Sequence, residues 1–309
     1  MTAAINNSIS ATDYNEIRSV VLSVLGPSSG TYGYGQSLKS TAVAEGDKVT
    51  INEWTNLRYD LVNISVHQTG AAPVIEVVHE GDTVRVDPTT APLNQYKTLA
   101  NTYLSNRFNI AGGQYSLIPK GSASQVWPGS LGTYWMSYIY TTVTVKWTNA
   151  ANARSFFNSG GQIKISSSRT GGTVSLQNSN WTSLLTSAGT QTFDGLPTSL
   201  FNFYNLTNSY TKIYSGYGTG SYTTNNYDIS VRCNSVANNS TGTENQLVFL
   251  IEWYDSFHTI SGVNNGPDKV DGTMSVSFST IEPSGIMQPS GTFSVESPVI
   301  TYSAITQVS

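Results

Sequence analysis

The chain has 309 residues, a length that allows two domains of ordinary size. Charged residues make up 11% of the sequence and the formal net charge is −4, whereas typical soluble proteins contain about 25% charged residues. This charge excludes a broad phosphate-binding surface and a polybasic membrane patch, so we expect no nucleic-acid partner and no membrane insertion.

The charge density and the apolar pattern both change along the chain. Residues 1–110 carry 17 of the 34 charged residues, and the remaining 199 residues carry the other 17. The first region shows helical spacings, whereas the second shows strand alternation between turn-forming residues. We therefore predict an α+β protein: a small helical assembly region at 1–110 with one β-hairpin, then a mostly antiparallel β-sandwich at 111–309 with short inserted helices.

Two of the expected helices have recognisable starts. Apolar residues recur at spacings of three and four over 13–25, where Asp13 and Glu16 form the predicted capping pair. A second helix is expected to begin at Thr50, which pairs with Glu53 in the same way.

A third helix is predicted over 92–108, because proline suits the first turn of a helix. Between the second and third helices, the β-rich segments 74–78 and 83–86 flank a Glu-Gly-Asp turn at 80–82. Two short strands around such a turn predict a β-hairpin.

The second helix carries one apolar stripe, formed by Trp54, Leu57, Leu61 and Ile64. This stripe either packs against the first helix or contacts a neighbouring subunit. Two helices and a hairpin provide a small core. We therefore expect part of 1–110 to pack against another chain, with these four residues as the candidate assembly surface.

The region 111–309 contains short alternating segments separated by Gly, Asn, Ser and Pro clusters. Strands are predicted over 138–147, 162–165, 227–233, 246–254, 273–281 and 292–295, and short helices over 150–157 and 181–187. The single cysteine, Cys233, lies in an alternating segment and is expected to be a buried thiol.

A search for metal and nucleophile motifs predicts no cofactor. The histidines do not show zincin spacing, and a structural zinc site lacks its cysteine pair. Asp255, Asp268 and Asp271 do not follow the spacing of a calcium loop, and the alternative is a solvated, turn-forming cluster. The G-x-S-x-G letters at 26–30 follow a predicted helix, whereas a nucleophile elbow follows a strand.

Paired carboxylates are the remaining catalytic candidate. Glu252 and Tyr254 are predicted on one face of a strand, with Trp253 and Asp255 on the other. A glycosidase places two carboxylates about 5–10 Å apart, and the best candidate pair is Glu252 with one of Asp255, Asp268 or Asp271. We favour a strand end with one buried face, and we predict that the protein is not an enzyme.

Tyrosines concentrate in a segment rich in Ser, Thr, Asn and Gly. Tyrosine offers a large contact area at low entropic cost, and Ser and Asn add adaptable hydrogen bonds. This composition indicates a surface for a glycan or for another protein subunit. The candidate residues are Tyr204, Tyr210, Tyr214 and Tyr217.

Several short motifs are specific as a set, although each is weak alone. They are Asp13-Tyr14-Asn15 with Ile17, Val24-Leu25-Gly26, Gly33-Tyr34-Gly35-Gln36, Trp54 with Leu57-Arg58-Tyr59-Asp60, His67-Gln68, Arg154-Ser155-Phe156-Phe157-Asn158-Ser159-Gly160-Gly161 with Ile163, Ser167-Ser168-Arg169-Thr170-Gly171-Gly172, Phe203-Tyr204-Asn205-Leu206-Thr207, Asp271-Gly272-Thr273 and Pro283-Ser284-Gly285. Together they resemble a group of virion structural proteins of tailed phages, especially myoviruses of marine cyanobacteria and related hosts.

The resemblance implies a non-enzymatic component of a virion, made in the host cytoplasm, that contacts other virion proteins and copies of itself in a symmetric oligomer. It leaves open the neck, the tail, the baseplate and the fibres. One alternative is a receptor-binding β-sandwich module that grips a host surface glycan. A second alternative is a head decoration protein.

Overall fold

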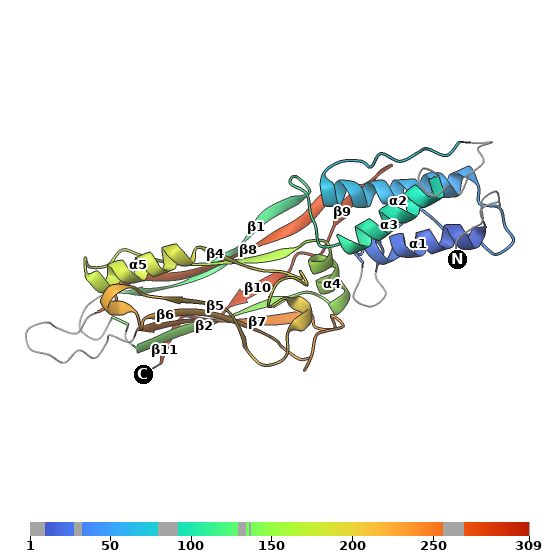
Figure 1. Cartoon of the computed structure of the whole chain (residues 1–309). Helices are drawn as coiled ribbons and strands as arrows, with labels where there is room; N and C mark the ends of the chain where they lie inside the picture. The colour runs from blue at the N-terminus through green and yellow to red at the C-terminus, as the bar shows by residue number, and fades with distance from the viewer. Residues whose placement is uncertain are drawn as a thin grey trace, which may run out of the picture. The chain divides into compact units, whose positions relative to one another are not determined.

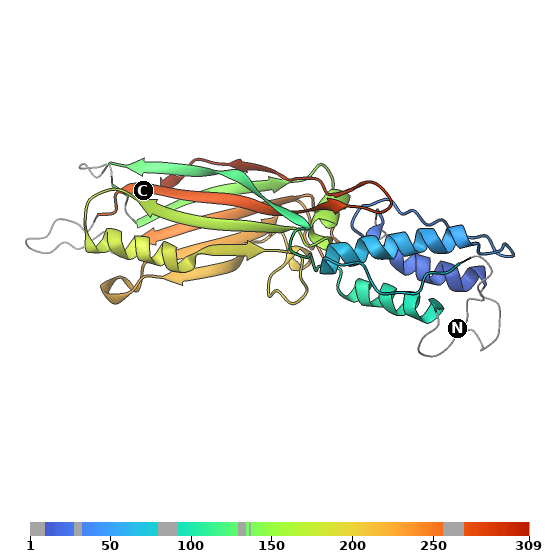
Figure 2. The same ribbon diagram turned by 90° about the horizontal axis from the view of Figure 1, so that it is seen from above.

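The chain folds as an α+β protein in which helices accompany two antiparallel β-sheets (Figures 1 and 2). The predicted fold class is thus confirmed. The computed structural model describes residues 10–27, 33–79, 92–128, 134–135, 137–255 and 269–308.

Two compact units share the chain. The first unit comprises Met1–Ser116, Ala151–Gly161 and Glu282–Ser297, and the second comprises Leu117–Ala150, Gln162–Ile281 and Pro298–Ser309. A single division after residue 110 therefore omits two segments of the first unit. Charge density and periodicity describe neighbours in sequence, and so they do not reveal distant segments that pack together.

The first unit contains helices α1 (Ala11–Leu25), α2 (Ile51–Thr69) and α3 (Pro92–Ser105). The capping pair of Thr50 and Glu53 is confirmed. At α1 the cap lies one turn earlier than predicted: the Ser10 hydroxyl accepts a hydrogen bond from the Asp13 amide at 3.2 Å, and the Asp13 carboxylate accepts one from the Ser10 amide at 3.1 Å. Ser10 satisfies an amide of the first turn, which the pair of Asp13 and Glu16 does not.

The apolar stripe of α2 lies in the core of its own unit. Trp54, Leu57, Leu61 and Ile64 are all buried. The Trp54 ring makes edge contacts with two other rings: its centroid lies 5.6 Å from that of Tyr14 of α1 and 5.3 Å from that of Tyr96 of α3. These four residues are therefore not an assembly surface, because α1 and α3 already cover them.

The segment expected to form the first strand of a hairpin is not a strand. Residues 74–78 have no regular secondary structure, although Ile75 and Val78 are buried. The Tyr96 hydroxyl donates a hydrogen bond to the Glu76 carbonyl at 3.3 Å. This segment therefore packs as an extended chain over α3, and the predicted turn and second strand at 80–86 lie outside the described residues.

Two sheets contain the strands of the second unit, and residues 115–116 of β1, residues 282–286 of β8 and the whole of β9 are assigned to the first unit. One sheet has the order β1 (Tyr115–Trp127), β8 (Gly272–Ile286), β3 (Gln162–Thr170), β4 (Thr190–Phe193), with β9 (Thr292–Ser294) on β8. The other has the order β10 (Val299–Tyr302), β2 (Ser137–Lys146), β7 (Gln246–Asp255), β6 (Asn226–Cys233), β5 (Thr211–Tyr217), with β11 (Thr306–Val308) on β2.

Aromatic side chains fill the space between the two sheets. The Phe249 ring of β7 contacts Phe193 of β4 at 5.6 Å and Phe278 of β8 at 5.4 Å, both in edge geometry. Cys233 is buried and unpaired in β6, as predicted, and burial raises the pKa of its thiol to about 12. The contacts across the sheets identify the unit as a β-sandwich.

Helix α5 (Leu176–Ala188) contacts β3 and β5, one strand from each sheet, whereas α4 (Ala150–Asn158) belongs almost entirely to the first unit. Both helices were predicted, α5 with a later start. Strands β1, β4, β5, β10 and β11 were not predicted. Within the described residues, no helix combines the length and the apolar character needed to cross a membrane.

Leu61→Ala is expected to lower the free energy of unfolding by about 2–5 kcal/mol, because it opens a cavity in a packed core. Urea denaturation measures this change. Leu22→Ala is the matched control, since Leu22 is exposed on α1 and its truncation leaves no cavity. Equal urea midpoints for Leu61→Ala and the wild type would contradict the burial of the stripe.

Candidate functional site

A buried polar cluster joins the three chain segments of the first unit. His67 of α2 lies with Nε2 2.9 Å from the carbonyl oxygen of Ser159, which follows α4. Its ring stacks on Phe293 of β9, with ring centroids 4.2 Å apart and planes 9° from parallel. The Gln36 amide donates to the Ser294 carbonyl at 2.7 Å, so the connection between α1 and α2 is also fixed to β9.

Tyr34 extends this cluster toward α3. Its hydroxyl donates to the Arg107 carbonyl at 2.6 Å and accepts from the Gln68 amide at 2.7 Å. The same Gln68 amide nitrogen donates to the Tyr103 carbonyl at 3.0 Å. Tyr34, His67 and Gln68 thus connect backbone groups that no local sequence pattern places together.

A glycine is required beside this cluster. Gly35 has a φ of +74°, and a Cβ atom there would lie 2.6 Å from the Ser155 Oγ atom. Side chains other than glycine are strained at this φ and also have no room. The structure therefore explains Gly35 of the motif Gly33-Tyr34-Gly35-Gln36 by its backbone conformation, and it explains Tyr34 and Gln36 by their hydrogen bonds.

The His67 ring is neutral in this environment. Burial lowers its pKa from 6.5 to about 4, although the Ser159 carbonyl opposes the change. Because a carbonyl oxygen only accepts, the proton belongs on Nε2. Nδ1 is buried and has no hydrogen-bond partner among the described residues, so protonation there would create a donor without an acceptor.

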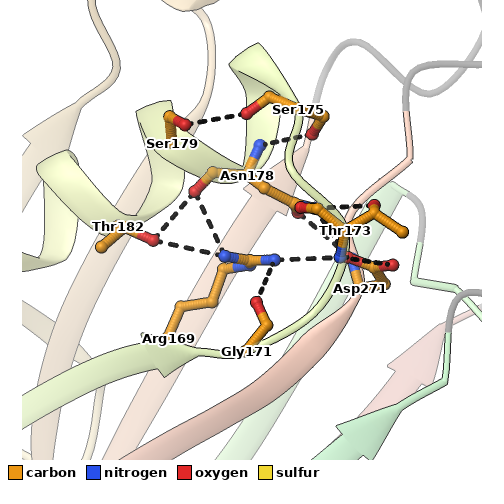
Figure 3. Close-up of polar contacts among 8 residues, drawn as sticks. All are labelled: Arg169, Gly171, Thr173, Ser175, Asn178, Ser179, Thr182 and Asp271. Atoms are coloured by element: carbon orange, nitrogen blue, oxygen red, sulfur yellow. Dashed lines mark hydrogen bonds and ion pairs between the residues drawn. The ribbon is translucent and has the colours of Figure 1, made fainter.

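A second buried polar cluster lies where β3, β8 and the start of α5 meet (Figure 3). Arg169 Nη2 lies 3.3 Å from Asp271 Oδ1, and both side chains are almost fully buried. Asp271 also accepts hydrogen bonds from the Thr173 amide at 2.9 Å and the Asn178 side-chain amide at 2.6 Å. Arg169 Nη2 donates in addition to the Gly171 carbonyl at 3.1 Å.

These contacts keep Asp271 ionised. Burial alone would raise its pKa, but the hydrogen bonds from Thr173 and Asn178 and the charge of Arg169 lower it. A Cβ atom at Gly172 would lie 2.3 Å from Asp271 Oδ1, so only glycine fits there. An ionised, enclosed carboxylate of this kind carries no proton to donate, so it does not serve as a general acid.

The carboxylates considered for catalysis or calcium binding do not converge. Asp255 is buried and accepts a hydrogen bond from Gln177, whereas Glu252 lies on the opposite face of β7, as predicted. Asp271 is enclosed by Arg169, and Asp268 lies outside the described residues. The described part of the chain contains no group of three His, Cys, Asp or Glu side chains arranged to hold a metal ion.

The four tyrosines proposed as a partner surface do not form one surface. Tyr214 packs against buried Tyr227, while Tyr217 lies on the other face of β5, since the strand pairs them with Ile229 and Asn226 of β6. Tyr204 packs edge-on against Phe203. Tyr210 is exposed and lies under Arg232.

A different group of tyrosines gathers on the outer face of the sheet that contains β2 and β7. The Tyr138 ring stacks on Tyr254 at 4.4 Å and on Tyr140 at 5.5 Å. The Tyr138 hydroxyl donates to Glu252 Oε1 at 2.7 Å. Alternation alone places Tyr138 and Tyr140 on one face of their strand, and Glu252 and Tyr254 on one face of theirs. The pairing of β2 with β7, which brings the two faces side by side, was not predicted.

Comparisons with known proteins return no relative: no family model matches the chain, and neither a curated protein nor a solved structure is significantly similar to it. The resemblance to tailed-phage virion proteins therefore rests on the sequence motifs.

The first prediction for these clusters concerns pH. The unfolded chain binds a proton at His67 near pH 6.5 but the folded chain only near pH 4, so the free energy of unfolding decreases as the pH falls through this window. At about 1.4 kcal/mol per pKa unit, the loss is about 3 kcal/mol. Urea denaturation between pH 7 and pH 4 measures it.

His67→Gln is expected to reduce this pH dependence, at the cost of lower stability at pH 7. His79→Gln is the matched control, because His79 is exposed, and it should retain the wild-type pH dependence. A His67→Gln variant with the wild-type slope between pH 6.5 and pH 4 would exclude His67 as the cause.

Asp271→Asn is expected to lower the free energy of unfolding by about 3–5 kcal/mol, because it leaves the buried Arg169 charge uncompensated. Thermal unfolding compares it with Glu16→Gln, which removes a half-exposed ion pair with Lys97 at 3.6 Å. The control should cost less than about 1 kcal/mol. Similar losses for the two variants would show that the Arg169–Asp271 pair is no more important than a surface contact.

Proposed function

We propose that the chain is a non-enzymatic structural subunit of a tailed-phage virion, which assembles with copies of itself and with other virion proteins. The observation that carries this proposal is where the motifs of the resemblance lie. The cluster around His67 brings together three of these motifs: Gly33-Tyr34-Gly35-Gln36, His67-Gln68 and the motif that contains Ser159. Ser167–Gly172 and Asp271-Gly272-Thr273 meet in the cluster around Arg169.

This placement favours a structural role over catalysis. Catalytic residues lie in clefts, where titratable groups with perturbed pKa values reach a substrate. Here the titratable motif residues His67, Arg169 and Asp271 are buried and engaged in contacts that join distant chain segments. The motifs thus maintain a fold, as expected of a protein that serves as a building block.

The composition supports the same proposal. Charged residues make up 11% of the chain, so copies of the protein experience little electrostatic repulsion when they approach one another. Few ions need to lose water when an interface forms. The contacts between copies have to use surfaces other than the stripe of α2, because that stripe is buried within its own unit.

Mass spectrometry of purified phage particles tests the proposal. We expect peptides of this chain in intact virions at a fixed ratio to the major head protein, and resistance of that ratio to repeated density-gradient purification. A replication enzyme of the same phage is the control for trapped cytoplasmic protein. A chain that is abundant in infected cells but absent from virions would refute the proposal.

A further inference from the structure

The outer face of the second-unit sheet carries a row of aromatic side chains. Strand register aligns Tyr138 of β2, Tyr254 of β7, Asn226 of β6 and Tyr217 of β5. Paired residues in antiparallel strands share one face of the sheet, and this face is opposite to the one that carries the Phe249 core. We call Tyr138, Tyr140, Tyr217 and Tyr254 the tyrosine row.

Stacking holds three rings of the tyrosine row in place, and two rings of the row reach solvent. The planes of Tyr138 and Tyr254 are 22° from parallel, and those of Tyr138 and Tyr140 are 15° from parallel. Tyr254 is 41% exposed and Tyr217 is 61% exposed. The stack fixes the ring positions before any ligand arrives, which lowers the entropic cost of binding.

Polar groups lie directly beside these rings. Register places Glu252 next to Asp228, which forms an ion pair with Lys212. The Tyr138 hydroxyl donates a hydrogen bond to Oε1 of Glu252. The Asn226 side-chain amide donates a hydrogen bond to Ser215 Oγ at 3.1 Å. Carboxylate oxygens accept several hydrogen bonds each, so Glu252 can accept further bonds from a ligand.

We propose that the tyrosine row binds a neutral oligosaccharide. Aromatic rings provide apolar contact for the C–H faces of sugar rings, and their hydroxyls provide a polar edge. The Glu252 carboxylate accepts hydrogen bonds from sugar hydroxyls. Glu252, Asp228 and Lys212 carry a combined formal charge of −1 − 1 + 1 = −1, which disfavours uronic or sialic acids.

The same face is poorly suited to bind a second copy of the chain. Cores of protein interfaces are depleted in charged side chains, whereas this face presents Glu252 and the Lys212–Asp228 pair among the tyrosines. A protein partner would remove water from Glu252 and from Lys212, whose side chain is half exposed. A sugar chain supplies hydroxyls that replace part of this water, so its binding costs less desolvation.

The spacing of the row fits a chain of sugars rather than one sugar. Tyr254 and Tyr217 lie on strands separated by one strand, which places their backbones about 10 Å apart at about 4.8 Å per strand. A ligand that contacts both rings therefore has to span several sugar units.

The experiment uses the full-length protein and isothermal titration calorimetry. The neutral probes are chitohexaose, maltohexaose and cellohexaose, and the acidic probe is hexagalacturonate. We expect at least one neutral probe to bind and the acidic probe not to bind. Tyr254→Ala and Tyr217→Ala should each weaken that binding by about tenfold, the loss of about one aromatic contact.

Tyr115→Ala is the matched control, because Tyr115 is similarly exposed, at 38%, and belongs to β1, a strand of the other sheet. It should bind as the wild type does, and circular dichroism checks that all variants fold. Failure of every neutral probe, equal binding of the acidic probe, or unchanged affinity in both row variants would each overturn the proposal. A change of oligomeric state in Tyr217→Ala would assign the row to a second copy instead.

This inference rests on the proposed function only for its setting, a virion surface that meets a host glycan. Particle mass spectrometry tests virion membership separately. A negative titration with a positive virion result would remove glycan binding alone, whereas a positive titration with no protein in particles would leave a glycan-binding protein of another kind.

Discussion

A polar side chain in a protein core has to find hydrogen-bond partners, and the first unit depends on this requirement. His67, Gln68 and Tyr34 are buried, and their partners lie on the chain after α4, on α3 and beyond its end. Satisfying these side chains brings together segments that are far apart in sequence. The helices could pack through their apolar stripes alone, but these bonds, together with those of Gln36 to Ser294, specify which distant segments complete the unit.

The second unit applies the same rule to charge. Arg169 and Asp271 are enclosed together with Thr173 and Asn178, so each charge has several partners (Figure 3). A buried pair of this kind contributes little net stability compared with apolar packing but makes the loss of one partner costly. The pair therefore fixes how β3, β8 and α5 meet, and Gly172 is needed because the carboxylate occupies the space of a side chain.

Local signals in the sequence predicted the local structure well. Thr50 with Glu53 identified the start of α2, and alternation identified β2, β6 and β7, because caps and strand faces depend on neighbouring residues. The strand predicted over 74–78 was wrong: its Val and Ile content fits a strand, but the segment packs on α3 and pairs with no strand among the described residues. The assignment of the α2 stripe to an assembly surface was wrong for a related reason: the burial of the stripe depends on helices that lie elsewhere in the chain. The two polar clusters were not predicted, because their members come from widely separated motifs.

Strand β7 shows how a core and a surface can depend on one register. Its alternate residues Phe249 and Trp253 are buried, while Glu252 and Tyr254 lie on the outer face. A slip of one residue against β2 would place Tyr254 in the core and Trp253 in water, at a large cost in free energy. The apolar core therefore holds the outer residues in their positions. The stacking of Tyr138 on Tyr254 follows from that register, and the outer face needs no further device to keep its rings in line.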